Sequence, residues 1–465
     1  MSPLRIVVVG GGLAGLTAAI DLREAGFDVV VLEARRRLGG AASSYQRGEL
    51  TIDNGQHVIL RCCDSYQALL ARLGVTSKVA FQDRFDVTVL APGPGQPGKV
   101  RQARLRRGNL PSPLHLTGAL TRYRLLPLAD RLKAGRAALA MRSIDAGDPA
   151  LDGQSLGDWL AGRWQSERAR RNLWDLFIVS ALNIAGDDAS LQLAATVIKT
   201  ALLGSKDAAD IGVAAVPLGE LHGRAPAELL ARLGAQVRMA AKAAAIRPVP
   251  AGGFAVRLAD DDEVIAADGV VLAVPSAQAS GLAKDAGVEG AERWGGLGAS
   301  PIVNVHVIYD RQVMELPFAA AVESPVQWVF DKSRIAGITS GQYLAVSLSA
   351  ADSYMQTPAA ELRDQFLPEL ARLFPAAAHA CVTDCFVTRE RRATFLQAPG
   401  CGALRPGAAT SVPGLVLAGS WTDTGWPDTM EGAVRSGHSA AQQLISELAR
   451  RPEAGRQAPV SEVAS

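Results

Sequence analysis

LRIVVVGGGLAGLTAAIDLREAGFDVVVLEARRRLGG, residues 4–40, is the stretch that decides the fold. An apolar run to Val9 meets three glycines, a helical pattern follows to Ala25, and Gly26 ends it. A second apolar run then closes on Glu33. This order of strand, glycine turn, helix, strand and acid predicts the βαβ unit that binds dinucleotides.

Each residue of the turn has a physical task. Gly10 permits the tight turn, Gly12 lets the backbone approach a diphosphate, and Gly15 allows the helix to pack closely on the strands. The free N–H groups at the start of the helix would hold the diphosphate, and Glu33 would accept hydrogen bonds from a ribose. A purely structural glycine turn is the alternative.

Composition sets the class of protein. At 465 residues the chain is long for one hydrophobic core, so two or more domains are expected. The 48 basic and 46 acidic residues nearly cancel, which argues against a dedicated nucleic-acid binder. No signal peptide and no apolar run of about 18 residues is visible, so we expect neither secretion nor a membrane span.

The cysteines favour a reduced, cytoplasmic setting. The five are odd in number and include no CxxC pair, so neither a disulfide framework nor a metal site is expected.

A basic stretch runs from Lys99 to Arg142, with eleven basic residues against the single acid Asp130. Leucines 125, 126, 128, 132 and 139 lie among them. A basic, partly amphipathic stretch is typical of a membrane-surface contact, with an ordinary solvated face as the alternative. Nucleic acid is disfavoured because only Tyr123 interleaves with the charges.

Helices are expected over residues 155–205, where Ser155 and Asp158 resemble a capping box. The stretch from Trp174 to Asn183 mixes aromatic, aliphatic and amide side chains. It is a candidate wall of an apolar pocket, with core packing as the alternative.

The rest of the chain alternates between strands and helices. Residues 302–309 predict a half-buried antiparallel strand, with His306 as a structural or surface residue. Further helices are expected from Ala359 to Leu373 and over 431–449. Strands are expected over 237–246, 254–258, 269–274 and 415–418.

We therefore predict an α/β fold in which a Rossmann-like dinucleotide domain is interleaved with an α+β substrate domain of mixed sheet and helices. The dinucleotide domain takes 1–85, 210–285 and 386–450, and the substrate domain takes 86–209 and 286–385. Residues 451–465 are expected to be a disordered tail.

Two segments carry a resemblance to a known family. The glycine turn with Glu33 and Gly39-Gly40 resembles the FAD-binding signature of the amine oxidase and phytoene desaturase superfamily. Residues 417–437, LAGSWTDTGWPDTMEGAVRSG, resemble its flavin-contacting motif. Residues 53–57, DNGQH, followed by two cysteines, resemble one subgroup, the squalene-associated hydroxysqualene dehydroxylases.

The resemblance implies FAD as the cofactor, with its flavin ring facing the backbone at the start of the last helix. The side chain of Glu431 is expected to serve the first helical turn rather than catalysis. Because only one dinucleotide fingerprint is visible, the electron donor is expected to be external. The implied cofactor contacts are Gly10, Gly12, Leu13, Ala14, Gly15, Glu33, Ala34, Gly39, Gly40, Ala41, Ala243, Gly419, Ser420, Met430, Glu431 and Ala433.

Two positions depart from the family pattern. Ala41 stands where the family usually has Arg, and Ser420 stands where it usually has Asp. Losing one charge-assisted contact costs about 1.5–3 kcal/mol, so weaker FAD binding is expected.

The subgroup implies removal of the allylic hydroxyl of hydroxysqualene to give squalene, a step of squalene and hopanoid synthesis. The triterpene would be taken up at the inner face of the cytoplasmic membrane. The proton donor or substrate hydrogen-bond partner is predicted to be His57 or Asp53, unless Asp53 only organises a turn. The predicted substrate pocket consists of Gln56, Trp174, Asn183, Trp421 and Trp426.

Three alternatives stay open. A phytoene or carotenoid desaturase would use the flavin in the oxidative direction, and an amine oxidase would act on a simple amine. A prenyl-lipid escort protein would use the same fold without redox chemistry. The sequence does not predict the oligomeric state.

Overall fold

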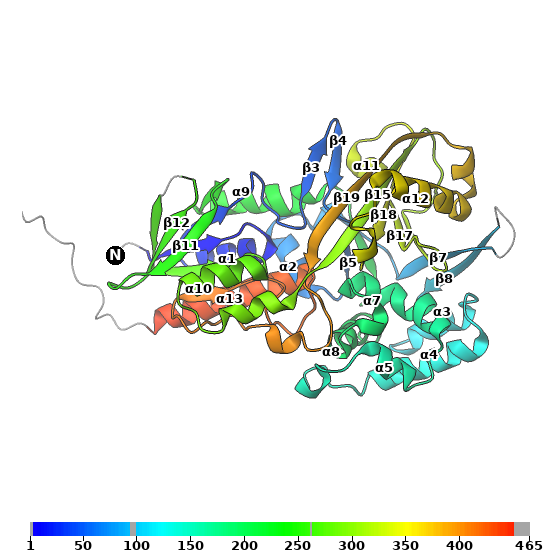
Figure 1. The fold of residues 1–465 in the computed structure, drawn as a ribbon, viewed down its shortest axis with the longest axis horizontal. Helices are drawn as coiled ribbons and strands as arrows, with labels where there is room; N and C mark the ends of the chain where they lie inside the picture. Colours follow the sequence, from blue (N-terminus) through cyan, green and yellow to red (C-terminus); the bar gives the residue numbers. More distant parts are fainter. Residues whose placement is uncertain (1–2, 94–98, 261–262, 451–465) are drawn as a thin grey trace, which may run out of the picture.

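The computed structural model describes residues 3–93, 99–260 and 263–450. Figure 1 shows a body with a parallel sheet at one end, and a second sheet above a group of helices at the other. The mixed α/β architecture is the predicted one. The tail predicted over 451–465 lies outside the described residues.

The first body is built on a five-stranded parallel sheet. Its strands, in spatial order, are β10 (Gln236–Met239), β2 (Asp28–Glu33), β1 (Arg5–Val9), β14 (Gly269–Leu272) and β20 (Leu415–Leu417). One face packs on α1 (Leu13–Glu24), α2 (Asp64–Arg72), α9 (Ala225–Arg232) and α13 (Met430–Ala449). Near-continuous apolar strands are what a sheet covered on both faces requires.

The other face of this sheet packs on a small antiparallel sheet and one helix. These are β11 (Ala243–Pro248), β12 (Phe254–Leu258), β13 (Val264–Ala267) and α10 (Ser276–Asp285). The body therefore has three layers, and its strands come from three separate parts of the chain.

The second sheet has seven strands. Its spatial order is β19 (Val382–Thr394), β15 (Ser300–Tyr309), β18 (Gln342–Leu348), β17 (Trp328–Asp331), β16 (Phe318–Ala321), β7 (Asp86–Pro92) and β8 (Val100–Arg106). Helix α12 (Ala359–Leu373) covers one face, at the predicted bounds. Strand β19 crosses residue 385, and the domain boundaries given above remain predictions.

Strand β15 corrects the prediction of a half-buried strand, because it is buried on both faces. The second face is covered by the hairpin of β3 (Ser44–Arg47) and β4 (Leu50–Asp53) and by α11 (Ser333–Ala336). His306 is fully buried and bonds Thr388 Oγ1 at 2.9 Å and Tyr343 Oη at 2.7 Å. It is structural and not a surface residue.

The helical group holds α3 (Thr117–Arg122), α4 (Leu128–Met141), α5 (Leu156–Ala161), α6 (Glu167–Ala169), α7 (Asp175–Leu182) and α8 (Leu191–Val197). The predicted cap of α5 is confirmed, since Ser155 Oγ accepts from Asp158 N at 3.0 Å. A small sheet of β5 (Val58–Leu60), β9 (Ile211–Ala214) and β6 (Val79–Phe81) completes the described fold.

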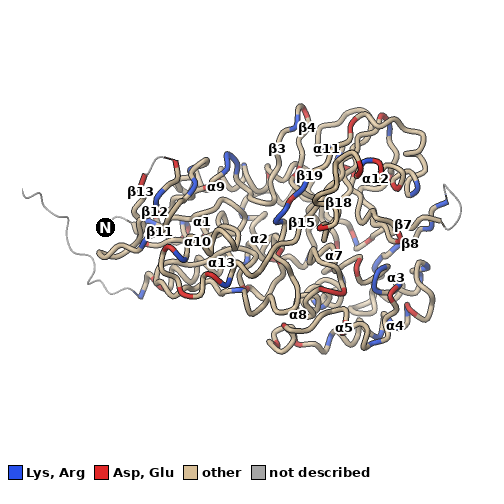
Figure 2. Tube along the Cα trace, in the orientation of Figure 1, with Lys and Arg blue, Asp and Glu red and all other residues tan. Residues whose placement is uncertain are grey.

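The basic stretch is not one surface (Figure 2). Arg107 is buried and bidentate to Asp210, at 2.6 and 2.8 Å, and Arg104 pairs with Asp86. Leu125 and Leu126, expected among the charges, are buried instead. In α4, exposed leucines and exposed basic residues lie on the same helix. Among the described residues no helix has the length and apolarity that crossing a membrane requires.

Candidate active site

One continuous cavity of about 1100 Å³ runs from the glycine turn to the helical group. Pockets for a single small molecule are usually about 300–1,000 Å³. The cavity is therefore large enough for a cofactor and a substrate together.

The glycine turn leaves open space at the start of α1. Gly10 has φ +114°, and a Cβ there would lie 2.2 Å from the Ala273 carbonyl oxygen, so only glycine fits. A Cβ on Gly12 would meet nothing nearer than Gly40 Cα, at 3.8 Å. Gly12 is the N-cap of α1 and no side chain caps that end, so the first N–H groups remain for a ligand.

Gly15 faces the strands and not the cavity. A Cβ there would lie 2.0 Å from the Gly10 carbonyl oxygen. Its predicted packing task is thus confirmed, while it is not among the residues that line the cavity.

Glu33 lies at the end of β2 with its carboxylate fixed by backbone donors. It accepts from Gly11 N at 2.8 Å and from Arg35 N at 2.8 Å. Ala34, Ala41 and Ala243 line the same end of the cavity. An acid held at this strand end is placed to bind ribose hydroxyls, so this half of the cavity fits a dinucleotide.

The start of α13 forms another wall. Met430, Glu431 and Ala433 line the cavity, and Thr429 caps the helix by accepting from Gly432 N at 3.1 Å. The Glu431 carboxylate accepts from Ser65 N and Tyr66 N at the start of α2 and pairs with Arg435. As expected, its side chain is structural.

Three residues that line the cavity carry unpaired polar atoms. Gln56 Oε1, His57 Nδ1 and Asn304 Oδ1 are buried without a hydrogen bond of normal geometry, and all three residues line the cavity. Burial lowers the pKa of His57, and the nearby Lys332 lowers it further while Asp53 raises it. His57 is therefore neutral at pH 7, and these atoms are available to a ligand.

Asp53 does not take part in the cavity, which corrects its predicted catalytic role. Its carboxylate accepts from Ser44 Oγ at 2.7 Å, Leu218 N at 3.0 Å and Lys332 Nζ at 2.8 Å. The side chain has no exposed surface. A carboxylate with three donors joins these segments and has no access to a substrate.

Trp174 is also misplaced by the prediction. It is buried in the core, with Nε1 bonded to Gln165 Oε1 at 3.1 Å, and it does not line the cavity. Core packing is thus its role. The other predicted pocket residues, Gln56, Asn183, Trp421 and Trp426, do line the cavity.

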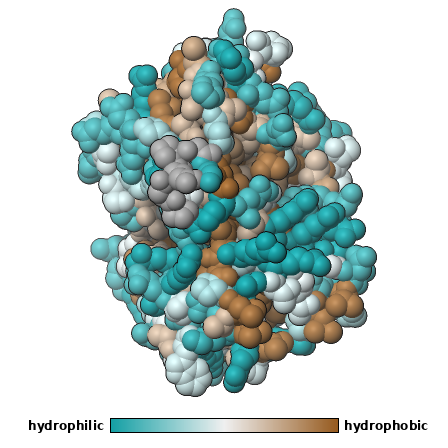
Figure 3. All heavy atoms as spheres, turned by 90° about the vertical axis from the view of Figure 1, so that its right-hand side faces the viewer, coloured by the Kyte–Doolittle hydropathy of each residue, from teal (hydrophilic) through white to brown (hydrophobic). Residues whose placement is uncertain are grey.

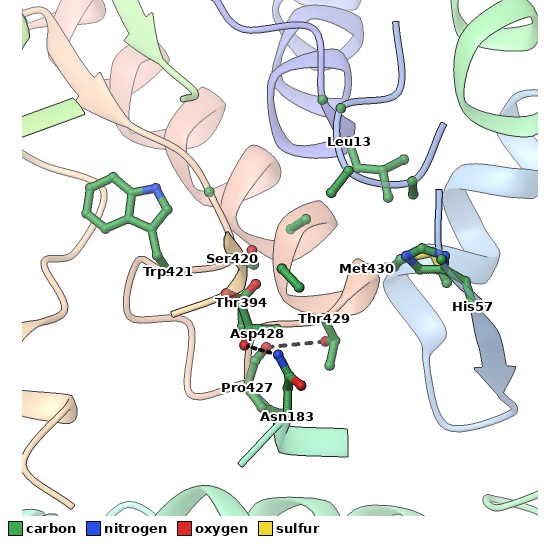
Figure 4. Close-up of a pocket in the computed structure, with 18 of the residues that line it drawn as sticks. Leu13, His57, Asn183, Thr394, Ser420, Trp421, Pro427, Asp428, Thr429 and Met430 are labelled. Carbon is green, nitrogen blue, oxygen red and sulfur yellow. Dashed lines mark hydrogen bonds between the residues drawn. The ribbon is translucent and has the colours of Figure 1, made fainter. Parts of the chain in front are cut away.

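Asn304 and Asp428 line the cavity but were not predicted from the sequence, and the second is an acid. Asp428 accepts from Phe395 N at 2.8 Å and is hydrogen-bonded by Ser420. Burial raises the pKa of its carboxyl group. Figure 4 shows it beside Ser420 and Thr394, with Asn183 facing them from α7. The available signal was an acid two residues before the last helix, inside the quoted motif.

The far half of the cavity is an apolar chamber. Its one tryptophan, Trp328, donates to Ser180 Oγ at 2.7 Å, which satisfies both polar groups. The chamber's apolar lining residues are Phe85, Val87, Leu176, Phe177, Val197, Leu202, Ile211 and Trp328, and Ser180, Thr196 and Thr200 from the same segments also line the cavity. Such walls fit a hydrocarbon chain.

Comparisons with known proteins agree with this geometry. A family model described as flavin containing amine oxidoreductase matches residues 13–445. The hydroxysqualene dehydroxylase of Rhodopseudomonas palustris is 30% identical over 446 residues, 94% of this chain and 98% of that protein. The 15-cis-phytoene desaturase of Glycine max is 26% identical, over 96% of this chain and 80% of its own.

A solved structure shares the fold. Cyclohexylamine oxidase from Brevibacterium oxydans superposes with a TM-score of 0.70 at 19% identity, covering 96% of this chain and 100% of that one.

Proposed function

The chain belongs to the family of flavin-containing amine oxidoreductases, and from this premise we propose that it is an FAD-dependent enzyme of isoprenoid metabolism. Its reaction is the reductive dehydroxylation of hydroxysqualene to squalene. The observation that carries this proposal is one cavity that runs from the glycine turn to a largely apolar chamber, with unpaired polar atoms among its lining residues.

FAD fits the first half of the cavity. The start of α1 after Gly12 would hold the diphosphate, Glu33 the ribose, and the start of α13 the flavin ring. When bound and reduced, the flavin supplies the hydride that replaces the hydroxyl group. Because a single glycine turn of this kind is present in the sequence, an external donor reduces the flavin.

The chain's own residues orient the substrate. The apolar chamber takes the hydrocarbon and excludes water, while Gln56, His57 and Asn304 offer unpaired polar atoms to a ligand in the cavity. Neutral His57 acts here as a hydrogen-bond partner and not as the acid. Trp421 and Trp426 line the same cavity, and an aromatic face stabilises a cation that develops beside it. The Arg435 guanidinium already lies over the Trp426 ring, 4.5 Å from its centroid, so Trp421 is the better placed of the two.

A phytoene-type desaturase is the second candidate, because the similarity to 15-cis-phytoene desaturase covers nearly the whole chain. It would use the same chamber with oxidised flavin and form a C=C bond. A prenyl-lipid escort protein would need no flavin, and an amine oxidase would need a polar amine site.

Product identification separates these functions. We expect the purified protein to be yellow and, after anaerobic reduction, to convert hydroxysqualene to squalene. Oxidised protein incubated with phytoene is expected to leave it unchanged. Desaturated phytoene without squalene would establish the second candidate, and a colourless protein without flavin absorption bands would support the escort function.

We also propose that α3 and α4 contact an anionic membrane surface, the inner face of the cytoplasmic membrane. Leu128, Leu132 and Leu139 lie on one stripe of α4 and are 59%, 62% and 55% exposed. Arg122, Arg124, Lys133, Arg136 and Arg142 are exposed around them, with no acidic partner in the part of the chain that the structure describes. Figure 3 shows apolar side chains at the lower end of this face, bordered by hydrophilic ones.

Vesicle sedimentation tests the membrane contact. The protein is expected to sediment with anionic vesicles at low salt and to be released at about 0.5 M salt, where the Debye length falls below about 5 Å. Leu132→Glu should weaken binding several-fold. The control is Val264→Glu, at an equally exposed valine on β13 at the other end of the molecule. Equal loss in both variants, or binding only to neutral vesicles, would contradict the assignment.

A further inference from the structure

We propose that Asp428 is the general acid that protonates the leaving hydroxyl group of the substrate. This inference rests on the proposed function, because the acid is needed only if a C–O bond is broken. It assigns the catalytic acid to a residue that lines the cavity beside Ser420, Thr394 and Asn183 (Figure 4).

The other carboxylates that line the cavity already accept hydrogen bonds from the protein. Among the described residues, four acids line the cavity, and Asp428 is one of them. Glu33 accepts two backbone N–H groups next to the glycine turn. Glu431 accepts two at the start of α2 and pairs with Arg435. Glu390 accepts from the side chain of Asn54 and the backbone of Arg392.

Asp428 has neutral partners only. Its hydrogen bonds come from Phe395 N and from the Ser420 hydroxyl, and within the described structure it forms no ion pair. Both partners are compatible with a protonated carboxyl group, which can donate its own O–H to a ligand in the cavity.

One charged group faces Asp428, the guanidinium of Arg405. Arg405 donates to the carbonyl oxygens of Ser420, Trp421, Thr422 and Trp426, so its N–H groups are directed at the backbone. Its uncharged neighbours include Thr394 and Phe395 at the end of β19, Asn183 at the end of α7, and Gln397, whose Oε1 accepts from Asp428 N (Figure 4). Arg405 lowers the pKa of Asp428, but burial is the larger effect and raises it.

The proposed step is the replacement of the substrate hydroxyl group by a hydride. The O–H bond of Asp428 breaks and its proton goes to the substrate hydroxyl oxygen. The C–O bond then breaks, and its electron pair leaves with water. The carbon gains the hydride that reduced flavin supplies, so the substrate is reduced and the flavin oxidised. Asp428 regains a proton from solvent before the next turnover.

The pH dependence follows from the raised pKa. Asp428 is competent only when protonated, so the rate is high below its pKa in the folded protein and falls as the pH rises through it. Ser420 donates to the carboxylate and thus lowers this pKa. Ser420→Ala should therefore move the descending limb of the profile to higher pH.

The test is single-turnover reaction of reduced protein with hydroxysqualene across pH. Asp428→Asn is expected to slow squalene formation by about 100-fold or more, with flavin content and affinity within threefold of wild type. It should also remove the descending limb. The matched control is Asp285→Asn, an exposed acid at the end of α10, which should leave the rate unchanged.

If Asp428→Asn fails to fold, the pH–rate profile of Ser420→Ala still tests the proposal. A limb that stays in place in Ser420→Ala, or an Asp428→Asn rate within threefold of wild type, would overturn the assignment. Failure of wild-type protein to form squalene would instead refute the proposed function itself.

Discussion

Gly12→Ala is expected to abolish flavin binding while leaving the fold intact. The backbone of Gly12, φ −81° and ψ 176°, is open to any L-residue, and the new methyl group would meet only Gly40 Cα at 3.8 Å. The substitution should therefore leave the stability of the flavin-free protein unchanged. A diphosphate at the start of α1 must approach this same backbone, and the methyl group would hold it away from the N–H groups.

We expect FAD affinity to fall by about 100-fold or more, which corresponds to ~2.7 kcal/mol. Flavin fluorescence measures the affinity, and circular dichroism and thermal unfolding of the flavin-free protein measure the fold. The matched control is Gly153→Ala, where a Cβ has no neighbour within 4 Å. Wild-type affinity in Gly12→Ala would show that the cofactor does not approach this turn.

The second large effect concerns the buried ion pair of Asp53 and Lys332. Asp53→Asn should lower the free energy of unfolding by about 3–5 kcal/mol, because the Lys332 ammonium then stays buried without a counter-charge. The side chains are 0% and 13% exposed, so water cannot replace the lost partner. Urea denaturation of the flavin-bound protein measures the change.

A double variant separates this structural role from catalysis. Asp53→Leu with Lys332→Met should be less destabilised than the sum of the two single variants, since neither charge is left alone. The folded fraction of each variant should keep the pH profile of the wild type. A stable Asp53→Asn protein that had lost turnover would restore the catalytic role that the geometry denies to Asp53.

The parts of the fold that could be predicted are those whose causes are local. The turn at Gly10, the helix after it and the acid at Glu33 follow from residue types within thirty positions. Strand β15 could not be predicted correctly, because its second face is covered by Ile52 and Ala336, from a hairpin far earlier in the chain and a helix after it. The alternation of polar and apolar residues along a strand does not indicate whether a distant segment packs on its second face.

The site divides in the same way. Within residues 53–57, Gln56 and His57 line the cavity, as predicted. The prediction was wrong for Asp53, because its partner Lys332 is 279 positions away. Asp428 was missed because its character depends on Phe395 and Ser420, which only the folded chain brings to it.

One cavity is proposed to hold both the flavin and the triterpene. Anaerobic mixing of the reduced FAD enzyme with hydroxysqualene is the most direct test of that shared cavity. The account predicts that the flavin absorption near 450 nm returns without oxygen and that one squalene forms per flavin oxidised. A flavin that stays reduced while the hydroxysqualene remains intact would contradict it.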